Sequence, residues 1–249
     1  MAVYAVSDIH GVYEIWNQIK HFLKEDDTLY VLGDCGDRGR DGWRIIKEIV
    51  RDKRVVYLKG NHEDMLVKAM TEWLDDYMSG KAYHLLLSNG GYDTINDWWC
   101  DEDPRYHQGW RDYLESLPQF MIYENAKGQK VHLCHAGYTP SGAPEPQIYN
   151  VCERKHWAED LVWDREHYFD PWPEEDEYND IVVVHGHTPT PYIAEDLGYK
   201  SEEFEVGAFW YADGHKVCID NATFATGIST LINLDTWEQY IFSIDKEDN

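Results

Sequence analysis

Three short apolar segments, each followed by a helical pattern, dominate the first 75 residues of the chain. Residues 2–6, 28–32 and 54–58 are apolar runs of strand length. Between and after them, apolar residues recur at the three-to-four-residue spacing of amphipathic helices, as in Ile45, Ile46 and Ile49. Strands that alternate with helices predict a parallel sheet with right-handed crossover connections. In such a sheet, ligands bind outside the carboxyl ends of the strands.

The pattern changes after this region. Residues 74–118 are rich in tryptophan and predict a helical insert, and residues 139–179 predict a long acidic loop. The strand pattern resumes in six further apolar runs, at 120–123, 130–134, 181–184, 216–219, 229–234 and 239–244, and the tail shows no helical pattern. We therefore expect one domain, residues 1–249, with an α/β first half, a β-rich second half and a helical insert at about 74–118.

The chain is strongly acidic, with 47 acidic and 22 basic residues and a net charge of −25. A nucleic-acid duplex is not an expected partner, because binding it requires clustered lysine and arginine. Five cysteines without a CxxC pair argue against a disulfide framework. The chain enters a strand directly, and no apolar run approaches membrane-spanning length. We expect a cytoplasmic protein with no signal peptide and no membrane contact.

Five of the predicted strands end in residues of the types that bind metal ions. These residues are Asp8, His10, Asp34, Asn61, His135 and His187. Each alone has a structural explanation, such as a helix N-cap, a turn or a hydrogen-bonded core histidine. Together, carboxylates, imidazoles and an amide oxygen suit Mn²⁺, Fe or Zn²⁺, and the lack of cysteine ligands argues against a structural zinc site. Six ligands exceed the needs of one tetrahedral ion and favour two ions, about 3.5–4 Å apart, that share a carboxylate.

Five short motifs surround these residues. In chain order they are Asp8-Ile9-His10-Gly11, Gly33-Asp34-x-x-Asp37-Arg38-Gly39, Gly60-Asn61-His62-Glu63, His135-Ala136-Gly137 and Gly186-His187-Thr188-Pro189. As a set they resemble the calcineurin-like metallophosphoesterases, and most closely the phosphoprotein phosphatase branch. That branch includes bacterial and phage serine/threonine phosphatases and the symmetrical diadenosine tetraphosphate hydrolases. The resemblance implies a four-layer α/β (α+β) fold with two mixed sheets sandwiched between helices.

The resemblance also implies two metal sites with a shared ligand. Asp8 and His10 would bind the first ion, and Asp34 would bridge it to the second. The other three candidate ligands, from the later motifs, would complete the second site.

The remaining motif residues would act on the substrate. His62 would be the general acid, held by Asp37, because an alkoxide leaving group needs a proton and a histidine beside a carboxylate can carry one near neutral pH. Arg38 would clamp the phosphate oxygens, with Arg165 as a second phosphate arginine and Asn61 as a further phosphate contact. The implied reaction is in-line attack on phosphorus by a hydroxide held between the two ions.

Three functions stay open at this point. The leading one is a serine/threonine protein phosphatase, with Mn²⁺ as the favoured metal and a phosphorylated protein or small phosphoester as substrate. The alternative is a bis(5'-nucleosyl)-tetraphosphatase with the same metals and a different substrate wall. A catalytically silent binding protein is disfavoured, because no expected ligand is missing. Neither C-x5-R nor GxxxxGK(S/T) occurs, so cysteine-based phosphatases and P-loop enzymes find no support.

Two further features carry expectations. Asn89-Gly90-Gly91, inside the predicted insert, resembles a segment of the phage and bacterial members of the branch. We expect it to approach the site, and the insert to help set substrate choice. Lys59 stands where many relatives carry arginine, and we expect it to support the loop.

Overall fold

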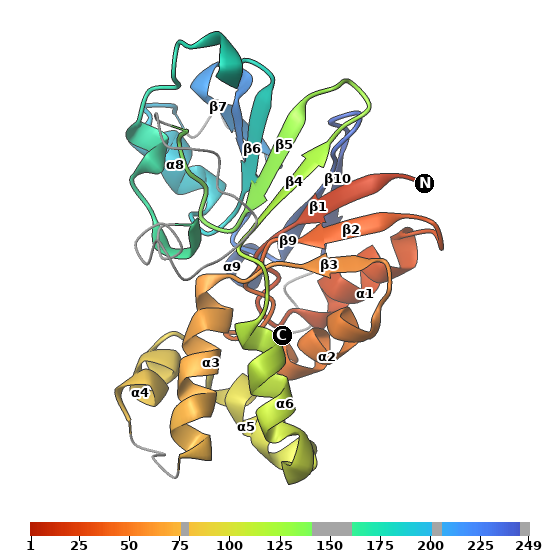
Figure 1. Ribbon diagram of the computed structural model, residues 1–249, viewed down its shortest axis with the longest axis vertical. Coiled ribbons are helices and arrows are strands. Elements are labelled where there is room, and N and C mark those ends of the chain that lie inside the picture. Colours follow the sequence, from red (N-terminus) through yellow and green to blue (C-terminus); the bar gives the residue numbers. More distant parts are fainter. Residues whose placement is uncertain (76–79, 141–160, 201–205, 245–249) are drawn as a thin grey trace.

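Two five-stranded β-sheets form the centre of the structure, which the computed structural model describes for residues 1–75, 80–140, 161–200 and 206–244. The sheets lie face to face, with helices on their outer sides (Figure 1). Both sheets mix parallel and antiparallel strands. The fold therefore has the two mixed sheets between helices that the sequence predicts.

The first sheet has the strand order β10-β9-β1-β2-β3. Its strands are β1 (Val3–Val6), β2 (Thr28–Val31), β3 (Val55–Tyr57), β9 (Ile228–Asn233) and β10 (Gln239–Ser243). Strands β1, β2 and β3 are parallel, with Val3 opposite Thr28, whereas β9 and β10 run antiparallel to their neighbours. The carboxyl ends of the three parallel strands share one edge, and Asp8, Asp34 and Asn61 follow them there.

The second sheet has the strand order β4-β5-β6-β8-β7. Its strands are β4 (Phe120–Glu124), β5 (Lys130–Cys134), β6 (Ile181–His185), β7 (Phe209–Tyr211) and β8 (Lys216–Cys218). The central strands β5, β6 and β8 are parallel, and the edge strands β4 and β7 are antiparallel. His135 and His187 therefore leave neighbouring strands at one edge. Strand β7 was not predicted, because a three-residue aromatic run is too short to show a period.

Helices α1 (Tyr13–Phe22) and α2 (Gly42–Arg51) contact the first sheet, α1 at β9 and β10 and α2 at β3. The alternation along β1 explains how that sheet is buried on both faces. Val3 and Ala5 belong to the apolar core between the sheets, whereas Tyr4 and Val6 belong to the core shared with the helices. Successive side chains on a strand point to opposite faces, so one short strand contributes to both cores.

Several of the other described elements are short helical segments. They are η1 (His167–Phe169), η2 (Asp176–Tyr178), α8 (Thr190–Asp196), η4 (Ala212–Gly214) and α9 (Thr223–Thr226). In α8, Ile193 and Ala194 pack with Phe209 and Tyr211 of β7. The expectation of a tail without helix is wrong for α9, a single turn that follows the left-handed residue Ala222. Residues 141–160 of the predicted acidic loop lie outside the described residues.

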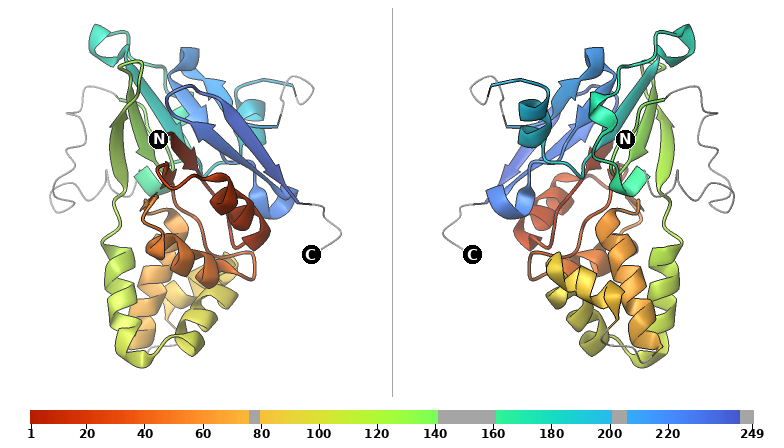
Figure 2. Two further views of the ribbon diagram at one scale, coloured as in Figure 1. Left: turned by 90° about the vertical axis from the view of Figure 1, so that its right-hand side faces the viewer. Right: turned by 90° about the vertical axis from the view of Figure 1, so that its left-hand side faces the viewer.

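Four helices gather at one end of the molecule, away from most of the sheet surface (Figures 1 and 2). They are α3 (Asn61–Leu74), α4 (Lys81–Ser88), α5 (Tyr92–Asp101) and α6 (Pro104–Glu115). Tryptophans form much of their core: the ring of Trp73 lies 6.3 Å from that of Trp98 and 5.2 Å from that of Trp99. Trp110 contacts Trp43 at 4.9 Å between ring centroids and thereby ties α6 to α2.

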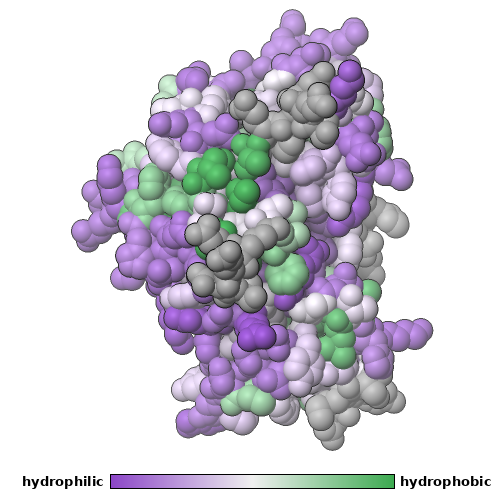
Figure 3. Space-filling view, turned by 180° about the vertical axis from the view of Figure 1, so that it is seen from behind, coloured by the Kyte–Doolittle hydropathy of each residue, from purple (hydrophilic) through white to green (hydrophobic). Residues whose placement is uncertain are grey.

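The face of the molecule opposite to Figure 1 is mostly hydrophilic, with small apolar groups between polar side chains (Figure 3). Among the described residues, none of the helices combines the length and apolar character needed to cross a bilayer. The four cysteines of the described segments, Cys35, Cys100, Cys134 and Cys218, are all free thiols.

Candidate metal centre

The residues that the sequence singles out adopt an unusual backbone conformation. Six of them have φ between 48° and 67°, namely Asp8, His10, Asp34, Asp37, Arg38 and His187. The left-handed region costs a residue with a side chain on the order of 1–3 kcal/mol, and it persists only where surrounding contacts fix it. The concentration of such residues at the strand ends marks this edge as a functional-site candidate.

Close packing of backbone against backbone holds these loops together. A Cβ atom on Gly11 would lie 2.5 Å from the carbonyl oxygen of Gly39, and one on Gly33 would lie 2.5 Å from the nitrogen of Gly60. Both Gly11 and Gly33 also have positive φ. Glycine is therefore required here for close approach as well as for turning.

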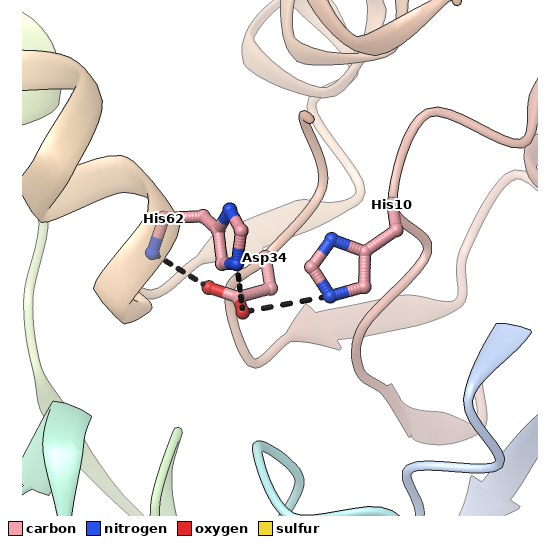
Figure 4. Close-up of side chains that lie close together, drawn as sticks. All are labelled: His10, Asp34 and His62. Carbon is pink, nitrogen blue, oxygen red and sulfur yellow. Dashed lines mark hydrogen bonds and ion pairs between the residues drawn. The ribbon is translucent and has the colours of Figure 1, made fainter. Parts of the chain in front are cut away.

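Asp34 lies at the centre of the site, between His10 and His62 (Figure 4). Its Oδ2 lies 3.7 Å from Nε2 of His10, 3.8 Å from Nε2 of His62 and 3.4 Å from Nε2 of His135. Its Oδ1 accepts a hydrogen bond from the backbone N–H of His62 at 3.0 Å. All four side chains are buried. One carboxylate oxygen thus faces three imidazoles, which is the position a bridging ligand requires.

A second group of ligand atoms surrounds His135. Its Nε2 lies 2.9 Å from Oδ1 of Asn61 and 3.2 Å from Nδ1 of His187. Together with Asp34, the histidines His135 and His187 form one set of buried ligand atoms, all within 4.8 Å of one another, and His10, Asp34 and His62 form another. Asp34 belongs to both groups, as a shared ligand between two ions would.

The hydrogen bonds of the rings show which nitrogen atoms face the centre. Nδ1 of His135 pairs with the carbonyl of Leu32 at 2.8 Å, and Nδ1 of His10 pairs with the carbonyl of Gly36 at 3.1 Å. A carbonyl only accepts, so each Nδ1 carries a proton and each Nε2 is free to bind a cation.

This arrangement fits divalent cations. Nε2 of His135 carries at most one proton, yet Oδ1 of Asn61, Oδ2 of Asp34 and Nδ1 of His187 all lie within 3.4 Å of it. Burial lowers the pKa of His135, but the charge and hydrogen bond of Asp34 outweigh this and raise the pKa to about 9. A proton on His135 therefore supplies positive charge that a metal ion would otherwise supply. The donor set of carboxylate, imidazole and amide oxygen suits hard-to-borderline divalent ions.

Asp8 lies at the border of the first group. Its Oδ1 is 3.7 Å from Nε2 of His10, and its Oδ2 accepts the backbone N–H of His187 at 3.0 Å and the hydroxyl of Ser7. Burial raises the pKa of Asp8, whereas the surrounding histidines overcome burial at Asp34 and hold its pKa well below the usual range. The structure thus brings all six predicted ligands together.

His62 and Asp37 form a hydrogen-bonded pair beside this cluster. Nδ1 of His62 lies 2.7 Å from Oδ2 of Asp37, and Nε2 lies 3.3 Å from Nη2 of Arg38. Burial lowers the pKa of His62, but the carboxylates of Asp34 and Asp37 outweigh it and raise the pKa above the ordinary value. The raised pKa favours a proton on the ring. In this structure Nε2 accepts from the guanidinium, because arginine can only donate.

Arg165 lies on the other side of the centre. Its Nη1 donates to the carbonyl of His187 at 3.3 Å and to Oγ1 of Thr188 at 3.2 Å. Two residues earlier, Nε1 of Trp163 donates to Oδ2 of Asp64 at 3.3 Å. This short segment therefore connects the loop of His187 with the first turn of α3. No contact joins Arg165 to Arg38 or His62 within the described ranges.

Glu63 is a supporting residue that the sequence reading names only as part of a motif. Its Oε2 accepts from the backbone N–H groups of Asp34 and Gly60, both at 2.8 Å. Its Oε1 accepts from the N–H of Cys35 at 3.0 Å and from the hydroxyl of Tyr57 at 2.7 Å. The signal was present, because glutamate at the third position of a helix can accept from the backbone N–H of the N-cap residue, here Gly60.

Asp220 is a second buried acid near the centre. Its Oδ1 accepts from the backbone N–H of Ala222 at 2.7 Å. Burial and the nearby charge of Asp8 raise its pKa well above the usual range. The residue follows β8, so it stands at a strand end like the predicted ligands.

Lys59 points away from the centre. Its Nζ donates to the backbone carbonyl of Glu115 at 2.7 Å and approaches the carboxylate of that residue at 3.3 Å. The lysine therefore ties the loop before α3 to the end of α6, in agreement with the supporting role expected for it. The Asn89-Gly90-Gly91 segment does approach the site, because the carbonyl of Gly90 accepts the N–H of Arg38 at 2.8 Å.

Comparison with known proteins places these motifs in context. The model of the family described as calcineurin-like phosphoesterase matches residues 1–219. A protein of Nitrosococcus oceani named symmetrical bis(5'-nucleosyl)-tetraphosphatase is 28% identical over 144 residues, which cover 56% of this chain and 45% of that protein. Because the match covers less than half of the relative, it does not by itself carry that protein's activity to this chain.

Solved structures share the fold along nearly the whole chain. A crystal structure of a putative diadenosine tetraphosphatase matches with a TM-score of 0.59 and 16% identity, covering 98% of this chain and 94% of that chain. A serine/threonine phosphatase from Saccharomyces cerevisiae matches with a TM-score of 0.60 and 14% identity, covering 99% and 81%. At such identity the likeness shows the fold alone.

Proposed function

This chain belongs to the calcineurin-like phosphoesterase family, and we propose that it is a metal-dependent phosphoric ester hydrolase whose substrate is a dinucleoside polyphosphate. The observation that carries the activity is the buried cluster in which Asp34 is shared by two groups of ligand atoms. The substrate class is supported by the tetraphosphatase name of the curated relative. The sequence alone favoured a protein phosphatase, and the relatives favour the alternative.

The reaction is hydrolysis of a P–O bond. The oxygen of water forms a bond to phosphorus and one proton of that water passes to solvent. The bond from phosphorus to the bridging oxygen breaks, and the departing phosphate leaves with that electron pair. Asp8, His10, Asp34, Asn61, His135 and His187 would hold the cations. When bound, two divalent cations supply Lewis acidity and activate water at neutral pH.

The residues of this chain would divide the remaining work. Asp37 holds Nδ1 of His62, so that Nε2, which accepts from Arg38 in this structure, would be the atom that carries a proton to the departing oxygen. Arg38 lies beside that nitrogen and offers a planar fork of donors to phosphate oxygens. The leaving oxygen and the phosphate would therefore meet donors from one short segment and from the start of α3.

The position of Trp163 favours a substrate that carries an aromatic group. Its indole N–H is bonded to Asp64 in the first turn of α3, two residues after His62, and 38% of the residue's surface is exposed. An exposed indole face beside a phosphate site is a platform on which a nucleobase can stack.

A serine/threonine protein phosphatase is the second candidate, and one observation favours it. The His62–Asp37 pair is complete, and a general acid matters most when the leaving group is an alkoxide, as from phosphoserine. A nucleoside diphosphate leaves as a stable anion and depends less on protonation.

Product analysis with Mn²⁺ present tests the proposal. The purified protein is incubated with diadenosine tetraphosphate or with a phosphoserine peptide. We expect faster hydrolysis of the dinucleotide than of the peptide, and loss of activity in Asp34→Asn. The control is Asp41→Asn, which should keep its activity, because Asp41 is a partly exposed carboxylate that pairs with Arg44. Hydrolysis of the peptide alone would overturn the substrate class, and full activity of Asp34→Asn would overturn the activity itself.

A further inference from the structure

Asp37 and Arg38 form two consecutive left-handed residues, both with φ of 63°. Neither is glycine, so each conformation costs on the order of 1–3 kcal/mol unless surrounding contacts fix it. The contacts that fix this pair therefore decide where the carboxylate and the guanidinium lie.

Those contacts come from the start of α5. The backbone N–H of Asp37 donates to Oγ1 of Thr94 at 2.8 Å, and the N–H of Arg38 donates to the carbonyl of Gly90 at 2.8 Å. Thr94 lies in the first turn of α5, and Gly90 lies just before that helix. Both backbone donors of the strained pair are thus held by one segment of the helical region.

Thr94 has no room to move. It is fully buried, and a Cβ on Gly42 would lie 2.4 Å from its hydroxyl oxygen. A Cβ on Gly36 would lie 3.2 Å from its methyl carbon. Gly36, in the loop after β2, and Gly42, the first residue of α2, therefore leave a space that the threonine side chain fills, and its hydroxyl has a fixed direction.

We propose that Thr94 is a positioning residue for the general-acid pair, so that the helix α5 sets the protonation of the leaving group. The inference rests on the proposed function, because it requires His62 to be the acid. The hydroxyl fixes the backbone of Asp37, Asp37 fixes the ring of His62, and the ring presents Nε2 to the leaving oxygen. A displacement of about 1 Å in such a chain can cost on the order of 100-fold in rate.

The test compares leaving groups. Thr94→Val keeps the shape of the side chain and removes the hydroxyl, which leaves the N–H of Asp37 without its acceptor. With Mn²⁺ present, we expect kcat for glycerol 2-phosphate to fall at least tenfold more than kcat for p-nitrophenyl phosphate, whose phenolate leaves without protonation. Thr94→Ser should restore both rates, and Thr94→Cys provides a second variant of similar volume if the valine variant does not fold.

A buried threonine away from the pair provides the matched control. Thr230 is also fully buried and bonds Asn221 through its hydroxyl. Thr230→Val should lower stability without changing the ratio of the two rates. Equal effects of Thr94→Val on both substrates would overturn the proposal.

A double variant separates this inference from the proposed function. In a His62→Asn background, Thr94→Val should cause less than a threefold further loss, because Thr94 acts through His62. An additive loss would overturn the inference. If His62→Asn itself slows both substrates equally, the assignment of the acid fails, and with it that part of the proposed function.

Discussion

Replacing Glu63 with glutamine should destabilise the loop that carries Asp34. One buried carboxylate accepts four hydrogen bonds, two at each oxygen, from Asp34, Gly60, Cys35 and Tyr57. The amide nitrogen of glutamine can take the place of either carboxylate oxygen. It fits better in place of Oε1, because the hydroxyl of Tyr57 can turn to accept from it and only the N–H of Cys35 then loses its acceptor. The opposite orientation would leave two backbone donors facing an N–H₂ group.

The magnitude follows from these contacts. One unsatisfied buried N–H costs about 1–3 kcal/mol, and two remaining bonds change from a charged to a neutral acceptor, at roughly 1 kcal/mol each. Relief of the repulsion between Glu63 and Asp34 offsets part of this. We expect a net loss of about 2–4 kcal/mol in the free energy of unfolding and a 10- to 100-fold weaker affinity for Mn²⁺, because the loop of Asp34 is supported by this carboxylate.

Urea unfolding and calorimetric titration with Mn²⁺ measure the two quantities. Glu48→Gln is the control, because Glu48 also accepts three side-chain hydrogen bonds but its side chain is 28% exposed. That variant should lose less than about 1 kcal/mol. A loss below 1 kcal/mol in Glu63→Gln together with unchanged Mn²⁺ affinity would refute the reasoning.

Three further predictions concern the pH dependence of stability, substrate stacking and steric fit at Gly186. The pKa of His135 is raised to about 9 in the folded protein, so the stability that its proton contributes is complete below the ordinary pKa of histidine and is lost as pH rises toward 9. After metal removal, the free energy of unfolding should therefore fall between pH 6.5 and 8 by on the order of 1.5 kcal/mol more in the unchanged protein than in His135→Gln. Equal slopes of that free energy against pH, measured in urea titrations, would contradict this. Trp163→Ala should raise KM for diadenosine tetraphosphate about tenfold and leave KM for p-nitrophenyl phosphate within twofold, because a stacked base contributes about 1–3 kcal/mol; equal shifts in the two KM values would exclude stacking. Gly186→Ala would place a Cβ 2.1 Å from Oδ2 of Asp8 and should weaken Mn²⁺ binding in titrations, whereas Gly109→Ala, with nothing within 4 Å, should not; unaltered binding by the first variant would show that Asp8 is no ligand.

The strand ends explain why so much of the site could be predicted. The period of the apolar residues distinguishes strands from helices, and parallel strands place their carboxyl ends at one edge. The polar residues after β1, β2 and β3 were therefore expected at one edge of the first sheet, and those after β5 and β6 at one edge of the second. The packing of the two sheets brings these edges together, so that the six predicted ligands lie close to one another. Short elements such as β7 and α9 escaped, because three or four residues show no period and tertiary packing forms them.

The supporting contacts required the tertiary structure. Thr94 is 57 residues from the Asp37 that it holds, and nothing in the local pattern of α5 indicates where its hydroxyl points. The direction of Lys59, toward Glu115 rather than the centre, likewise depends on how α6 packs beside α3. The sequence by itself determined which residues are candidate ligands and at which end of each strand they stand, because both follow from residue type and strand period. Only the tertiary structure decided which groups hold those ligands in place, because a hydrogen bond depends on distances and angles between segments that are remote along the chain.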